Sequence, residues 1–119
     1  MFNMLFVQYP KCSTCRKAKK WLDEHDIEYE SRHIIEENPT AEEIETWWNL
    51  SDLPLKRFFN TSGMKYRELK LKDKLPDMSE KEQFELLATD GMLVKRPIVV
   101  GDDFVLVGFK EKEWEENLI

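Results

Sequence analysis

The hydrophobic pattern near the N-terminal end changes from a strand-like run to a helical stripe and back. Residues 2–9 are mostly apolar, which predicts a β-strand buried on both faces, and Pro10 ends it. Residues 13–25 carry apolar side chains at helical spacing, and residues 27–35 predict a second strand. The helical stripe consists of Cys15, Ala18, Trp21 and Leu22. This order predicts a βαβ unit with a right-handed crossover.

The middle of the chain is predicted to be helical. Thr40 with Glu43 and Ser79 with Glu82 have the capping-box spacing that marks two helix starts. Further predicted features are a short helix after Pro54, a turn over residues 60–63, a helical turn over residues 64–70 and a helix end near Ala88. We therefore expect a helical insertion over about residues 38–90.

The last third returns to β-structure. Residues 97–100 and 104–107 are short β-branched runs, and a Gly-Asp-Asp sequence between them predicts a tight hairpin turn. Residues 111–118 predict a closing helix with Trp114 facing the core. The whole order predicts an α/β protein with strands from both ends of the chain.

Composition narrows the class of protein. A length of 119 residues fits one domain, which we expect to cover residues 1–119. No apolar run approaches the ~20 residues of a membrane span, and a net charge of −6 argues against general binding to nucleic acid or anionic membranes. The first residues lack the basic and long apolar parts of a secretory signal, so we expect a cytoplasmic protein and, by default, a monomer. Two cysteines in a reducing compartment are catalytic or regulatory more often than structural.

Basic and acidic residues are unevenly distributed. Residues 9–20 contain five bases and no acid, residues 21–45 contain ten acids and one base, and residues 56–74 contain seven bases and two acids. One interpretation is that these runs are the solvated faces of helices. The alternative interpretation is that the two basic segments meet around one site and attract an anion.

The strongest chemical signal is Cys12-Ser13-Thr14-Cys15, which lies where the first strand gives way to the first helix. The first amide groups of a helix have no intrahelical partner and favour a thiolate there, with Lys11 and Arg16 adding positive charge. We expect Cys12 to be the nucleophile and Cys15, about one turn further on, to be the resolving thiol.

Other interpretations of the cysteines are weaker. One alternative is that the two cysteines are unrelated, with one of them packed on the helix. Another is that they are zinc ligands. A zinc site needs further ligands, and neither His25 nor His33 has zinc-finger spacing. We therefore expect no metal, and we expect each histidine to be solvated or hydrogen-bonded.

Two other segments are candidates for the same site. Arg96-Pro97 precedes a predicted strand, which makes this bond a candidate cis peptide, and Arg96 is then placed to hold an anion or stabilise the Cys12 thiolate. The alternative is a trans proline and an arginine in a surface ion pair. Asn60-Thr61-Ser62-Gly63 offers hydroxyl donors in a turn, although a simple helix cap and turn explains it as well.

Five segments together make the chain resemble the ArsC/Spx family, and they span nearly the whole chain in order. They are residues 9–18, 58–63, 66–69, 71–73 and 87–97. That family includes glutaredoxin-coupled arsenate reductases, Spx-type regulators and unassigned ArsC-like proteins. The resemblance implies a thioredoxin-like fold with a four-stranded mixed sheet and a helical insertion.

The resemblance also implies roles for individual residues. Cys12 matches the catalytic cysteine of the arsenate reductases, and Arg96 matches their Arg-Pro arginine. Their two other oxyanion-binding arginines align with Phe58 and Gly108, with Arg57 one position away. Cys15 matches the second cysteine of the Spx-type regulators, where the pair acts as a disulfide switch.

Three functions follow as expectations. The first is a thiol-disulfide oxidoreductase that acts on a thiol or disulfide substrate or a redox protein, with glutathione, glutaredoxin or thioredoxin as reductant and no bound cofactor. The second is a redox-sensing regulator that binds the RNA polymerase α subunit. The third is a glutathione- and glutaredoxin-dependent arsenate reductase, for which we expect weak or no turnover that should rise on replacing Phe58 and Gly108 with arginine. The residues expected to contact substrate are Lys11, Ser13, Thr14, Arg16, Asn60, Thr61, Ser62, Gly63 and Pro97.

Overall fold

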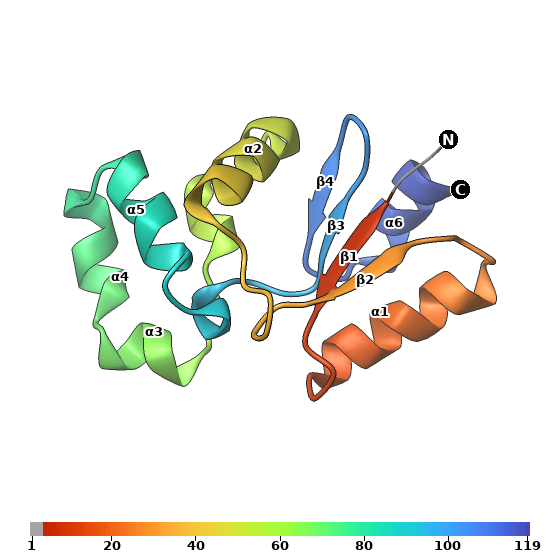
Figure 1. Cartoon of the computed structure of the whole chain (residues 1–119), viewed down its shortest axis with the longest axis horizontal. Coiled ribbons are helices and arrows are strands. Elements are labelled where there is room, and N and C mark those ends of the chain that lie inside the picture. Colours follow the sequence, from red (N-terminus) through yellow and green to blue (C-terminus); the bar gives the residue numbers. More distant parts are fainter. Residues whose placement is uncertain (1–3) are drawn as a thin grey trace.

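A mixed β-sheet forms one half of the molecule (Figure 1). Its strands are β1 (Leu5–Gln8), β2 (Glu30–His33), β3 (Ile98–Val100) and β4 (Val105–Val107). The computed structural model describes residues 4–119, and within them four strands pair in the order β2-β1-β3-β4. β1 is parallel to β2 and antiparallel to β3, and β3 is antiparallel to β4. The βαβ unit and the terminal hairpin predicted from sequence are confirmed.

One face of the sheet is covered by the helices α1 (Ser13–Glu24) and α6 (Glu111–Leu118). Phe6 on β1 lies beside Val99 on β3, and Val99 lies beside Leu106 on β4, so all three side chains point to this face. They pack against Trp21 of α1 and the fully buried Trp114 of α6. Trp114 therefore faces the core, as predicted.

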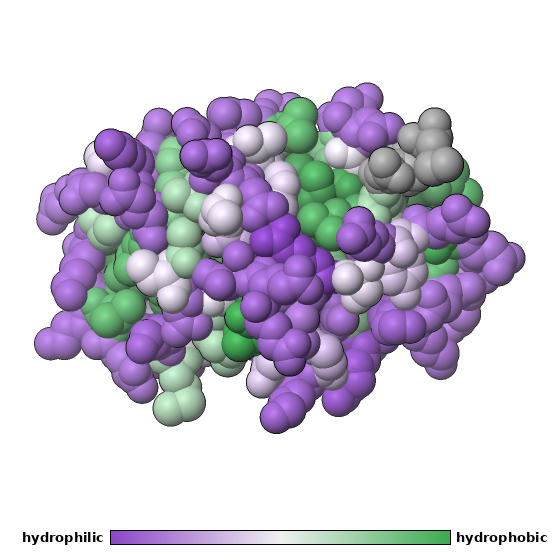
Figure 2. Space-filling view, in the orientation of Figure 1, coloured by the Kyte–Doolittle hydropathy of each residue, from purple (hydrophilic) through white to green (hydrophobic). Residues whose placement is uncertain are grey.

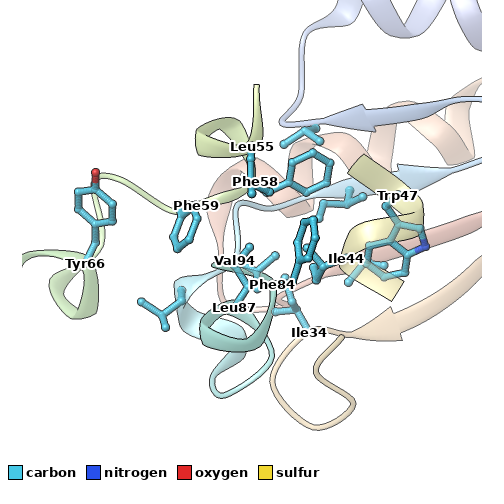
Figure 3. Packing of buried hydrophobic residues seen from close by; sticks show 14 of the residues in the cluster. Ile34, Ile44, Trp47, Leu55, Phe58, Phe59, Tyr66, Phe84, Leu87 and Val94 are labelled. Carbon is cyan, nitrogen blue, oxygen red and sulfur yellow. The ribbon is translucent and has the colours of Figure 1, made fainter. Parts of the chain in front are cut away.

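The opposite face of the sheet packs against the insertion. The next residues along the strands, Val7, Ile98 and Val107, are also in register and belong to a second hydrophobic cluster. This cluster joins them to side chains of the insertion, among them Ile44 and Phe84 (Figure 3). Strict alternation along β1, β3 and β4 thus divides the core into two parts.

The insertion occupies the left half of Figure 1. Its elements are α2 (Ala41–Ser51), η1 (Leu55–Phe58), α3 (Met64–Glu68), α4 (Leu71–Lys74), η2 (Leu75–Asp77), α5 (Glu80–Leu87) and η3 (Gly91–Leu93). Both predicted capping boxes are present, at Thr40 with Glu43 and at Ser79 with Glu82. These caps satisfy the first amides of α2 and α5 and fix where each helix begins.

A bidentate ion pair ties the sheet to the insertion. Arg32 of β2 donates from both terminal nitrogens to the Glu43 carboxylate at the start of α2, at 2.6 and 2.8 Å. The Arg32 Nε also donates to the backbone oxygen of Glu37. Hydrogen bonding from Arg32 lowers the pKa of Glu43 to about 2, despite the opposing effect of burial. The pair holds α2 against the polar edge strand.

The structure differs from the prediction in a few places. The segment expected to be one helical turn over residues 64–70 forms α3, which ends at Glu68 with Leu69 as its C-cap. Lys70 then adopts a left-handed conformation, and a new helix, α4, follows. The second strand is shorter than predicted, since only Glu30–His33 pairs with β1. The predicted first strand begins at residue 2, and residues 2 and 3 lie outside the described part. No helix in residues 4–119 is long and apolar enough to cross a membrane.

Candidate active site

Cys12 occupies the N-cap position of α1. Its N–H donates to the Tyr9 oxygen at 2.9 Å, and its own oxygen accepts the first helical hydrogen bond, from Arg16, at 3.0 Å. An N-cap side chain accepts hydrogen bonds from the second or third helical N–H, which here belong to Thr14 and Cys15. Cys12 therefore takes the chain position of the serine or aspartate that caps other helices, but its sulfur makes no side-chain capping hydrogen bond in the part of the chain that the structure describes.

This position controls the charge of the Cys12 thiol. Partial burial acts to raise the pKa, but the helix N–H groups of Cys15 and Thr14, the Cys15 thiol and the Arg96 guanidinium favour the thiolate and outweigh it. The net effect is a pKa below that of an ordinary cysteine. Cys12 is half-buried and lines an open cleft, so its sulfur can be reached from the cleft.

Cys15 has the opposite environment. It is fully buried on the inner side of α1, and its sulfur accepts a hydrogen bond from the Tyr9 N–H at 3.5 Å. Burial raises its pKa to about 12, and the neighbouring Cys12 sulfur adds to the increase. Both cysteines are free thiols in this structure. The pair thus consists of one accessible, acidic thiol and one shielded, protonated thiol.

Arg96 lies beside Cys12 on the segment that enters β3. The Arg96-Pro97 peptide bond is cis, as predicted. The guanidinium carbon lies 5.2 Å from the ring centroid of Tyr9, and the Nε and Nη1 atoms are buried without a hydrogen-bond partner in residues 4–119. A buried cationic donor without a partner is costly unless a ligand satisfies it. The expectation that Arg96 holds an anion stays a prediction, and these two donors are the observation that bears on it.

Backbone pairing places the Asn60–Gly63 turn opposite Arg96. The Asn60 N–H donates to the Leu93 oxygen and the Lys95 N–H donates to the Phe58 oxygen, each at 2.8 Å. These two bonds fix the insertion against the residues that precede β3. Within the turn, the Gly63 N–H donates to the Asn60 oxygen at 3.1 Å.

A cleft of about 920 Å³ opens between the sheet half and the insertion, with Cys12 in its wall. It is lined by Cys12, Thr14, Arg57, Asn60, Ser62, Gly63, Met64, Lys65, Glu68, Asp90, Met92, Lys95, Arg96, Val107, Gly108, Phe109 and Lys110. Hydrophilic residues cover most of the face seen in Figure 2, with smaller hydrophobic patches among them. The cleft thus combines the Cys12 thiol with several cationic side chains.

The predicted site residues divide into two groups. Those that line the cleft are Cys12, Thr14, Asn60, Ser62, Gly63 and Arg96. Those outside its lining are Lys11, Ser13, Cys15, Arg16, Thr61 and Pro97. Cys15 lies behind Cys12 in the core, and Thr61 lines a separate pocket of about 320 Å³ that shares Arg57 and Lys95 with the cleft.

Several cleft residues were not singled out by the sequence, among them Lys65, Lys95 and Lys110. The basic run over residues 56–74 contained a signal for Lys65 and Arg57, both of which line the cleft. The first basic run lies elsewhere: Lys19 pairs with Asp23 and Lys20 with Glu24 on the outer face of α1. The idea that both basic runs meet at one site is therefore wrong for the first run.

Phe58, which aligns with an oxyanion-binding arginine of the arsenate reductases, lies outside the lining of the cleft. Phe58 is fully buried in the core, whereas its neighbour Arg57 is exposed and lines the cleft. An arginine at position 58 would be buried among apolar side chains. That substitution is therefore expected to destabilise the core rather than to raise arsenate reduction. Gly108 does line the cleft.

Both histidines have structural partners. The His25 ring nitrogen Nδ1 is 2.7 Å from the Trp21 oxygen, and the His33 Nδ1 accepts hydrogen bonds from the backbone of Ile35 and Glu36. Across residues 4–119, no group of three or more His, Cys, Asp or Glu side chains is arranged to hold a metal ion.

Comparison with known proteins agrees with this geometry. The uncharacterized protein YusI of Bacillus subtilis is 59% identical over 97% of this chain and 98% of its own length. The regulatory protein MgsR of the same organism is 33% identical over 93% of this chain and 86% of its own length. Sequence similarity therefore extends over almost the whole chain.

Two solved structures have the same fold. An ArsC family related protein from Bacteroides fragilis is 64% identical with a TM-score of 0.93, over 95% of each chain. A possible arsenate reductase from Streptococcus mutans is 44% identical with a TM-score of 0.86, over 94% of this chain and 97% of its own. The expected thioredoxin-like arrangement, with its mixed sheet and inserted helices, is confirmed. The model of the ArsC family matches residues 7–117, and the chain belongs to that family.

Proposed function

We propose that this protein is a thiol-disulfide oxidoreductase with Cys12 as nucleophile and Cys15 as resolving thiol. The observation that supports this best is the N-cap position of Cys12, where helix amides and Arg96 lower the pKa of an accessible thiol. Attack on a disulfide requires a thiolate, so the reactive fraction of Cys12 at neutral pH exceeds that of a free cysteine.

The proposed reaction has two exchange steps. The Cys12 thiolate attacks one sulfur of a disulfide, forms a mixed disulfide with it and releases the other sulfur as a thiolate. Cys15 then loses its proton and attacks the Cys12 sulfur, which releases the bound thiol and forms the Cys12–Cys15 disulfide. Two electrons have passed to the substrate, and two equivalents of glutathione, or a glutaredoxin or thioredoxin, restore the dithiol.

The raised pKa of Cys15 explains why Cys15 reacts only after Cys12 has formed the mixed disulfide. Part of the increase in the Cys15 pKa comes from the adjacent Cys12 sulfur. Once Cys12 is in a mixed disulfide, its negative charge is gone and that contribution disappears. Burial still opposes ionisation of Cys15, so we expect resolution to be the slower step.

The test measures both steps separately. Reduction of a small neutral disulfide by the reduced wild-type protein should yield one Cys12–Cys15 disulfide per substrate, detected by intact mass. Cys15→Ser should stop at the mixed disulfide, and Cys12→Ser should not react. Equal reactivity of Cys12→Ser and wild type, or labelling of Cys12 by iodoacetamide with the pH midpoint of a free thiol, would contradict the proposal.

A redox-sensing regulator is the second candidate, because the relative MgsR is a regulatory protein and the Cys12–Cys15 pair is suited to a disulfide switch. In that case the oxidised and reduced forms should differ in binding to the RNA polymerase α subunit. A pull-down with both forms decides this, and no binding by either form removes the candidate.

Arsenate reduction is the third candidate, supported by the possible arsenate reductase of S. mutans and by the presence of Arg57 and Arg96 in one cleft. Arginines bind tetrahedral oxyanions well. A coupled assay with glutathione, glutaredoxin and arsenate tests it, and absence of turnover removes it. A cytoplasmic location, where thiols are kept reduced, would suit all three candidates.

A further inference from the structure

The cleft has a charge opposite to that of the whole chain. The protein carries a net charge of −6, whereas the cleft lining contains more basic than acidic side chains. The basic ones are Arg57, Lys65, Lys95, Arg96 and Lys110, and the acidic ones are Glu68 and Asp90. The Asp90 carboxylate already accepts a hydrogen bond from the Met92 N–H at 2.8 Å. The cleft therefore attracts anionic ligands to an acidic protein.

The cations of the cleft come from separate parts of the fold. Lys65 is on α3, Lys95 precedes β3 and Lys110 is the N-cap of α6. A ligand that contacts all three must extend across the cleft. The volume of about 920 Å³ is near the upper end of the range for small-molecule sites, about 300–1,000 Å³. A single tetrahedral oxyanion at Arg96 would leave most of it empty.

The cleft also offers apolar contacts. Met64 at the start of α3 is 75% exposed and Met92 on η3 is 37% exposed, and both line the cleft. Methionine side chains are flexible and adapt to varied partners. Exposed thioethers among lysines suit a polypeptide, which carries apolar and charged side chains together, better than a small inorganic ion.

We propose that the cleft binds a cysteine-bearing segment of an acidic polypeptide, with carboxylates that flank the cysteine contacting Lys65, Lys95 and Lys110. This inference rests on the proposed function, because it names the class of substrate that Cys12 attacks. The step is the exchange described above: a bond forms between the Cys12 sulfur and the segment's cysteine, the segment's disulfide breaks, and the departing sulfur takes the electron pair as a thiolate.

Binding can be measured separately from chemistry. The probe is a fluorescent peptide with aspartate and glutamate on both sides of a central serine, which replaces the cysteine. Fluorescence anisotropy should show binding to the wild-type protein that weakens with salt and is about tenfold tighter than binding of the peptide with asparagine and glutamine in place of the acids.

Matched protein variants locate the binding. The triple variant Lys65→Gln, Lys95→Gln, Lys110→Gln should bind the acidic peptide about tenfold more weakly. The control triple variant Lys17→Gln, Lys81→Gln, Lys112→Gln removes the same charge at exposed positions outside the cleft and should bind like wild type. Equal loss in both variants, or equal binding of the acidic and amide peptides, would overturn the inference.

Combined with the disulfide-reduction assay, the binding data separate this inference from the proposed function. If the wild-type protein reduces a neutral disulfide but does not prefer the acidic peptide, the oxidoreductase stands and the acidic substrate is wrong. If the acidic peptide binds but Cys12 exchanges with no disulfide, both the function and the substrate assignment fail. Glutathione disulfide that displaces the peptide as effectively as an unlabelled acidic peptide would overturn the polypeptide assignment in favour of a small thiol.

Discussion

Glu43→Gln tests how strongly the Arg32–Glu43 pair stabilises the fold. The pKa of Glu43 is about 2, against an ordinary value of 4.5. At about 1.36 kcal/mol per unit, that difference corresponds to at most roughly 3.4 kcal/mol of stability at neutral pH. The Glu43 side chain is 34% exposed and Arg32 is 17% exposed, so solvent screening reduces the expected effect to about 1–2 kcal/mol.

The sign of the pH dependence follows from the direction of the shift. Because folding lowers the pKa of Glu43, the stabilisation is fully present above the ordinary pKa and is lost as the pH falls from about 4.5 towards 2. The free energy of unfolding, measured by urea titration with tryptophan fluorescence, should therefore differ most between wild type and Glu43→Gln at neutral pH. The difference should shrink in acid.

Glu42→Gln is the matched control. It removes a carboxylate from the same first turn of α2, but Glu42 is exposed and forms none of the ion pairs found in residues 4–119. Glutamine at position 43 keeps an oxygen that can accept the capping hydrogen bond from the Thr40 N–H. Equal destabilisation by both variants, or a Glu43→Gln deficit that does not change with pH, would refute the argument.

Three other predictions concern the site and its support. Gly91→Ala should lower the free energy of unfolding by about 1–3 kcal/mol, because the added carbon would lie 2.0 Å from the Ile34 oxygen; Gly101→Ala, which meets only a movable phenylalanine ring, should cost less in the same urea titration. Cys12→Ser should lower the pKa of Cys15, although burial keeps that pKa above the ordinary value. The assay is alkylation of Cys15 as a function of pH, and an unchanged midpoint would mean that the two sulfurs do not interact. Arg96→Met should raise the pKa of Cys12 in an iodoacetamide titration and Arg96→Lys should restore part of the decrease, whereas identical midpoints would exclude Arg96 as a stabiliser of the thiolate.

The parts of the fold that the sequence predicted well are those with strong local signals. β1, β3 and β4 lie in the predicted apolar runs, and both capping boxes mark helix starts as expected. The second strand was harder to delimit, because Glu30–His33 is a polar edge strand whose pairing with β1 decides its ends. The break between α3 and α4 depends on the left-handed conformation of Lys70, which no local sequence rule indicated.

The site shows the same division between local and tertiary information. The position of Cys12 could be predicted because the junction of strand and helix is contained in a few consecutive residues. The other cations of the cleft could not, because Lys95 and Lys110 meet the insertion only in the folded chain. In η1, a shift of one residue separates the buried Phe58 from Arg57, which lines the cleft. Sequence spacing alone did not resolve that shift.

The two backbone hydrogen bonds that join residues 58–60 to residues 93–95 have a consequence for how the protein matures. They connect parts of the chain that are distant in sequence, so the Arg57 wall of the cleft is assembled only when the tertiary structure is complete. Helix α1, which begins at Cys12, forms from nearby residues, whereas the opposite wall of the cleft and Arg96 come from distant ones. A fragment that stops before residue 57 would therefore carry Cys12 without either partner, and only the complete folded chain brings the site together.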